Sequence, residues 1–153
     1  MPEMTISDYI ELGMLYIREE RYRSAYKPLR QALLVYGQRD AEDVPTVLLS
    51  YYGLCLVALE KEVDRGLDFC RQAIEQAGHR TDFYLNLGKA YLFLNRKSQA
   101  IAAFQHGLEI DHDARLNAEL RRLGVRRNPL LAFLPRHHFL NRYLGLWRAR
   151  RHS

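Results

Sequence analysis

Histidine and cysteine are the residues of this chain with the widest scope for metal binding or covalent chemistry. His137 and His138 are adjacent, and neighbouring residues of a helix point apart, so one metal ion cannot use both. No third ligand lies at helical spacing from them. The two cysteines, Cys55 and Cys70, are not in a C-x-x-C or zinc-ligand spacing. We therefore predict no metal site and no cofactor.

A second group of polar residues lies between His106 and Asp113 and includes Asp111 and His112. Aspartate beside a helix end is typical of capping, so this group is better explained by structure than by chemistry. The chain has no glycine-rich phosphate-binding loop, H-E-x-x-H motif or nucleophile elbow. We assign no catalytic residues and predict that the protein is not an enzyme.

Length and composition indicate one globular domain in a cytoplasmic setting. The chain has 153 residues, of which 48% are hydrophobic and 27% charged, which is ordinary for a protein with one packed core. Its first residues lack the basic-then-apolar order of a secretory signal. The longest uncharged run, from Val44 to Leu59, is shorter than the roughly 20 residues that span a bilayer. We therefore interpret it as a buried helix.

Charge is distributed unevenly along the chain. Residues 1–113 contain 13 Lys and Arg against 17 Asp and Glu, whereas residues 114–153 contain ten arginines and a single acid, Glu119. The sequence thus predicts an acidic body, residues 1–124, followed by a basic extension, residues 125–153.

The body contains a threefold internal repeat, and its elements would position any binding residues. A bulky residue precedes Gly13, Gly53 and Gly88, and another bulky residue follows each glycine by three positions. Twelve or thirteen residues after each glycine comes a small residue, then a larger one, then another small one: Ala25, Leu29 and Ala32; Gly66, Cys70 and Ala73; Ala100, Phe104 and Gly107. Apolar stripes separated by small residues are typical of two closely packed helices. Since one such hairpin leaves an apolar face uncovered, stacked copies must share a core.

These residues resemble the tetratricopeptide repeat (TPR) family, whose signature is W-x2-L-G-x2-Y, then A-x3-F, with a period of 34. The repeats are expected at about 6–39, 46–80 and 81–114, and a capping helix at about 113–123. The resemblance implies an all-α fold: a right-handed α-solenoid of three TPR hairpins with a C-terminal capping helix, followed here by an additional tail helix. Pro28 falls inside the second predicted helix and is expected to bend it or delay its start.

The resemblance also implies a concave groove, lined by the first helix of each hairpin, that binds a peptide. The positions that match the groove-lining ones are Ile10, Met14, Ile17, Tyr51, Leu54, Val57, Leu85, Asn86, Lys89 and Phe93. Most are apolar. Some family members clamp an acidic carboxyl-terminal peptide with Lys and Asn, but Ile10 and Met14 stand at those places here. We therefore predict a groove for an apolar segment of a protein partner.

The basic extension is predicted to include an amphipathic helix whose interacting residues are Phe139, Arg142, Tyr143, Leu144, Trp147 and Arg148. Three explanations stay open. The extended part of the tail can occupy or border the apolar groove while the tail helix packs on the repeats or on a second subunit, and packing on a second subunit would be self-association through the tail. It can also lie on an anionic membrane surface, which suits a basic helix with an interfacial Trp. Nucleic-acid binding is the third and the least supported, because the sequence has no recognisable reading module.

The sequence as a whole predicts a protein-interaction scaffold or adaptor. Its partner is expected to be a protein or peptide held in the groove. Two alternatives are a secretion-type chaperone that guards apolar segments of its partner and a peripheral membrane adaptor anchored by the basic helix. All three are non-enzymatic.

Overall fold

The computed structural model describes residues 4–37 and 44–125, and all regular structure within these ranges is α-helical. The helices are α1 (Ile6–Arg18), α2 (Tyr22–Gly37), α3 (Thr46–Ala58), α4 (Val63–Ala77), α5 (Thr81–Phe93), α6 (Lys97–Ile110) and α7 (Ala114–Arg122). Contacts divide the chain into Met1–Leu123 and Gly124–Ser153. The predicted all-α solenoid is confirmed, whereas the predicted tail helix lies outside the described residues.

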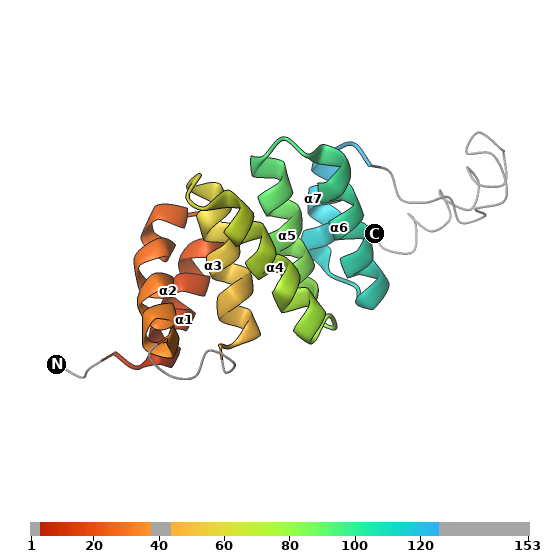
Figure 1. Cartoon of the computed structure of the whole chain (residues 1–153). Coiled ribbons are helices and arrows are strands. Elements are labelled where there is room, and N and C mark those ends of the chain that lie inside the picture. Colours follow the sequence, from red (N-terminus) through yellow and green to blue (C-terminus); the bar gives the residue numbers. More distant parts are fainter. Residues whose placement is uncertain (1–3, 38–43, 126–153) are drawn as a thin grey trace, which may run out of the picture. The chain divides into compact units, whose positions relative to one another are not determined.

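The helices form three hairpins, α1–α2, α3–α4 and α5–α6, and α7 packs against α6 and α5. Figure 1 shows α2, α4 and α6 in one layer in front of α1, α3 and α5. The three hairpins use the same close approach. A Cβ atom on Gly13 would meet the Leu29 side chain, one on Gly53 would meet the Gly66 carbonyl and Cys70, and one on Gly88 would meet the Phe104 ring. The glycines are thus required where paired helices cross.

The core is centred on α3, which packs between neighbours on both sides. Every residue from Leu48 to Val57 is buried, because α3 contacts its own partner α4 and also α1, α2 and α5. A helix that is apolar all round is expected in such a position. The prediction of a buried helix in the uncharged run is therefore confirmed, and no helix among the described residues is long and apolar enough to cross a membrane.

Side-chain caps begin two of the helices, α1 and α7. Thr5 and Asp8 form a reciprocal capping box at the start of α1, and Asp113 accepts a hydrogen bond from the Arg115 backbone at the start of α7. Gly124, with φ of +77°, follows the end of α7. Pro28 does not delay α2, which begins at Tyr22 and continues past it. The expected late start of α2 was therefore wrong, because the buried Pro28 is accommodated inside the helix, whereas a bend at Pro28 stays a prediction.

The turn inside each hairpin contains a residue with left-handed backbone conformation. Glu20, Glu60 and Asn95 lie seven residues after the three repeat glycines and have φ values of +57°, +54° and +57°. This conformation is unfavourable for a side chain such as Glu, whereas Asn tolerates it. The recurrence shows that the turns are equivalent and that two of them are strained.

Replacing Glu60 by Asn, the residue of the third turn, should relieve part of this strain. We expect Glu60→Asn to raise the free energy of unfolding by about 0.5–1 kcal/mol. Urea denaturation would measure the change. Glu75→Asn is the matched control, because it removes the same charge from an exposed position inside α4. A gain at Glu75 equal to that at Glu60 would mean that charge, not backbone conformation, is responsible.

Candidate binding surface

The candidate site is the face made by α1, α3 and α5, called here the α1–α3–α5 face. The structure places the ten predicted groove residues on these three helices, but it buries six of them: Ile17, Tyr51, Leu54, Val57, Leu85 and Asn86. Ile10, Met14 and Lys89 are partly buried, and Phe93 is 45% exposed. The accessible part of this face is therefore supplied by α1 and α5, while the residues of α3 are covered.

Hydrogen bonds tie α3 to α5 beneath this face. The Asn86 side-chain amide donates to the Ser50 hydroxyl at 3.0 Å, and both side chains are buried. The Tyr51 hydroxyl donates to the Asp82 carboxylate at 3.3 Å. Burial, together with the negative charge of Asp82, raises the pKa of Tyr51. Asn86 and Tyr51 thus have partners within the protein and contribute to holding adjacent repeats together.

The first and third repeats also touch through long side chains. The Lys89 ammonium group lies 3.1 Å from the Glu20 carboxylate. The Tyr22 and Phe93 rings meet edge to face, with centroids 5.1 Å apart and planes at 88°. Burial and the charges of Glu20 and Glu119 raise the pKa of Tyr22 to about 12. We call these four residues the repeat 1–3 bridge, because they connect the first repeat to the third.

Charged pairs also lie around the amino-terminal ends of α5 and α7. Arg80 binds Asp82 through two hydrogen bonds, of 3.1 and 2.8 Å, and Arg115 lies 2.6 Å from Asp113. The hydrogen bond from Arg115 holds the pKa of Asp113 well below its usual range. Sequence reasoning missed Arg80 and Arg115, because their partners become apparent only when the helix ends are placed.

Cys55 and Cys70 are free and buried. The Cys55 thiol donates to the Tyr22 carbonyl at 3.1 Å, and burial raises the pKa of both thiols to about 12. Thiols with such pKa values are not nucleophiles at neutral pH. In the described ranges, no three His, Cys, Asp or Glu side chains are placed to hold a metal ion.

The predicted tail contacts, Phe139 to Arg148, lie outside the described residues, as do His137 and His138. The three explanations for the basic extension therefore stay predictions.

Comparison with known proteins agrees with this geometry. Residues 58–123 match the sequence model of the tetratricopeptide repeat family. This range runs from the end of α3 to the end of α7 and so contains the second half of the middle hairpin, the third hairpin and the capping helix. No curated protein matches the chain significantly.

Solved structures with the same fold include three TPR domains. The first TPR domain of human RPAP3 is 20% identical, with a TM-score of 0.58 over 78% of this chain and 89% of that one. The first TPR of Spaghetti (RPAP3) bound to the HSP90 peptide SRMEEVD is 19% identical, with a TM-score of 0.56 over 78% and 92%. YrrB, described as a TPR protein with an unusual peptide-binding site, is 21% identical, with a TM-score of 0.55 over 79% and 59%. At these identities the likeness establishes the fold.

Proposed function

Because the chain is a tetratricopeptide-repeat protein, we propose that it is a non-enzymatic scaffold that binds an apolar segment of a protein partner. The segment lies against the α1–α3–α5 face. Peptide binding by structural relatives, one of which was solved with an HSP90 peptide, supports binding of this general kind.

The proposal rests on one observation: three of the four accessible side chains among the predicted groove residues are apolar. Ile10 and Met14 are partly exposed on α1, and Phe93 is 45% exposed on α5. Exposed apolar side chains on the face of a helical array are a source of binding free energy, because a partner removes them from water. Lys89, in its pair with Glu20, is the one charge among the predicted groove residues.

An acidic carboxyl-terminal peptide is a poor match for this face. Ile10 and Met14 offer no hydrogen bond to a carboxylate. Lys89, the one cation among the predicted groove residues, already pairs with Glu20, so an acidic ligand would have to compete with that carboxylate. We therefore expect an apolar ligand to be preferred over an acidic one.

A peptide array tests this preference. Tiled peptides with an apolar centre are expected to bind the full chain, and the acidic peptide SRMEEVD is expected not to bind. The substitutions Met14→Asp and Phe93→Asp should each lower the affinity for the bound peptides at least tenfold, since each places a charge in the proposed contact. Binding constants for the strongest peptides can be measured by fluorescence anisotropy.

Leu34→Asp is the matched control, because Leu34 is an exposed apolar residue of α2, outside the α1–α3–α5 face. It should leave peptide binding unchanged. Selection of SRMEEVD over apolar peptides, or equal losses at Leu34 and Phe93, would contradict the proposal. The chaperone and membrane-adaptor alternatives are not favoured by any described residue.

A further inference from the structure

A second candidate site lies between α4 and α6, with α5 as its floor. It is a hollow of about 360 Å³, called here the α4–α6 hollow. Its apolar lining consists of Ile74, Tyr84, Leu87, Tyr91, Ala102 and Ala103. None of these belongs to the accessible part of the α1–α3–α5 face, so the hollow is separate from the surface proposed above.

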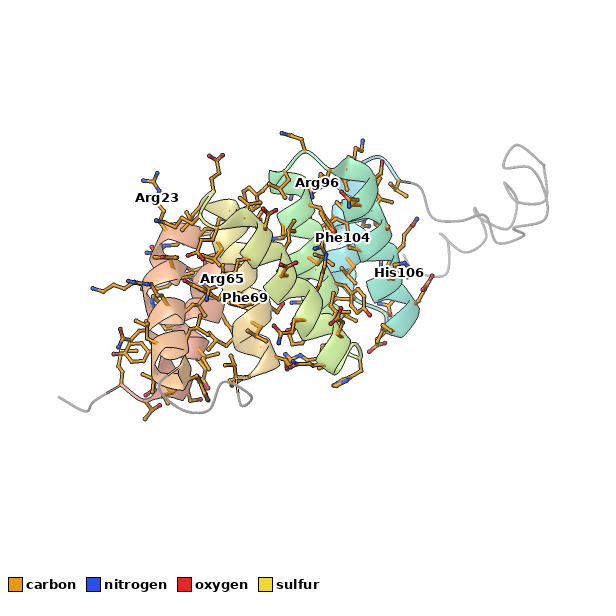
Figure 2. All side chains as sticks on the ribbon, viewed as in Figure 1. Arg23, Arg65, Phe69, Arg96, Phe104 and His106 are labelled. Atoms are coloured by element: carbon orange, nitrogen blue, oxygen red, sulfur yellow. The ribbon has the colours of Figure 1, made fainter. Side chains whose placement is uncertain are left out.

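The hollow arises from an exchange of large and small residues between two repeats. Cys70 and Phe104 are equivalent, because they face Gly53 and Gly88 respectively. The residues before them, Phe69 and Ala103, are therefore equivalent as well. In the second repeat the large residue is Phe69, outside the helix crossing, whereas in the third it is Phe104, inside the crossing and fully buried (Figure 2). The third repeat is consequently short of one aromatic ring at Ala103.

The second repeat indicates which chemical group fits the space at Ala103. The Phe69 ring packs on the Tyr52 ring, with centroids 6.3 Å apart, and Tyr52 is equivalent to Leu87 on the floor of the hollow. An aromatic ring is thus the group that an equivalent repeat places there. A cavity of about 150 Å³ with apolar walls accommodates benzene, so about 360 Å³ has room for a phenyl or indole ring with its adjoining methylene.

The charges at the rim indicate what flanks the ring. The Arg71 guanidinium forms an ion pair with Asp68 at 3.1 Å and donates a hydrogen bond to the Tyr91 hydroxyl at 3.4 Å. Glu75 lines the hollow, and no cation among the described residues forms an ion pair with it. His106, on α6 (Figure 2), also lines the hollow and lies 3.1 Å from Glu109. With Arg71 neutralised by Asp68, Glu75 leaves the rim acidic.

We propose that the α4–α6 hollow binds an aromatic side chain of a protein partner, with a Lys or Arg next to it that pairs with Glu75. The ring takes the place that Phe69 fills in the preceding repeat. The cation adds electrostatic complementarity at the rim. The scaffold then has two separate surfaces for proteins, one on α1 and α5 and one between α4 and α6.

Short blocked dipeptides test the proposal on the full chain. N-acetyl-Trp-Arg-amide is expected to shift the Ala102 and Ala103 methyl resonances upfield in a saturable way, because an indole ring then lies over them. N-acetyl-Trp-Glu-amide should bind at least threefold more weakly, and N-acetyl-Leu-Arg-amide should cause no ring-current shift. Absence of saturable shifts with the first probe would overturn the proposal.

Variants locate the binding. Ala103→Phe fills the hollow with a ring of the protein itself and should abolish the probe-induced shifts. Ala114→Phe, at an exposed position of α7, should not abolish them. Glu75→Gln leaves the hollow intact and should remove the preference for Arg over Glu, so the test does not depend on the folding of Ala103→Phe. Unchanged probe binding in Ala103→Phe would refute the site. An Ala103 methyl that is already shifted in the free protein, and released by Trp147→Ala, would instead identify the chain's own carboxyl-terminal segment as the occupant and would also overturn the proposal.

Discussion

Replacing Gly53 by alanine is expected to lower the free energy of unfolding by about 3 kcal/mol, because no free space exists where α3 crosses α4. The added Cβ would lie 2.5 Å from the Gly66 carbonyl oxygen and 2.9 Å from the Cys70 sulfur. The first of these atoms is backbone, so rotation of a side chain cannot relieve the overlap. The two helices must move apart, and α3 contacts helices of all three repeats. Thermal and urea unfolding would measure the loss.

The matched control is Gly37→Ala at the end of α2, where an added Cβ would meet nothing within 4 Å. Because Ala has the higher helix propensity, this change should be neutral or stabilising by up to about 1 kcal/mol. Gly66→Ala should resemble Gly53→Ala, since its Cβ would lie 2.7 Å from the Gly53 carbonyl. Similar stabilities for Gly53→Ala and Gly37→Ala would show that the crossing can open at little cost.

The repeat architecture could be predicted from the sequence because its signals are local and occur three times. Gly13, Gly53 and Gly88 with their partners in the second helices define each crossing, and the structure has these contacts. That α2 continues through Pro28 could not be predicted from such local signals. A proline in a helix removes one hydrogen bond, but whether packing compensates depends on neighbours that the local sequence does not specify.

The accessibility of the binding face could not be predicted, because it depends on pairs far apart in the chain. Lys89 and Glu20 are 69 residues apart, and Tyr22 and Phe93 meet across the middle repeat. A family pattern gives the helix and the direction of each position, but it does not say which side chains reach across. The same limit applies to Ala103, whose small size had no evident meaning until its equivalence with Phe69 was established.

Asn86 shows the difference between a position that resembles a binding residue and one that is free to bind. On the family pattern it belongs to the groove. In the structure it is 3% exposed, and its amide donates to the equally buried Ser50 hydroxyl. An amide committed in this way has little capacity left for a ligand, so its main contribution should be to the stability of the α3–α5 contact.

We therefore expect Asn86→Ala to lower the free energy of unfolding by about 2–3 kcal/mol, because it leaves the buried Ser50 hydroxyl without its partner and opens a small cavity. Ser50→Ala should cost less. The double variant should destabilise the protein by less than the sum of the two single variants, since no polar group is then left unpaired. A double-mutant cycle from urea unfolding would give the coupling energy directly.

Met14→Ala, on the accessible part of the same face, is expected to have the opposite effect. The free energy of unfolding should change by less than about 1 kcal/mol, because the side chain is only partly buried, whereas apolar peptides should bind more weakly. Additive losses of stability in Ser50→Ala and Asn86→Ala, together with weaker peptide binding by a stable Asn86→Ala protein, would indicate that Asn86 contacts the peptide.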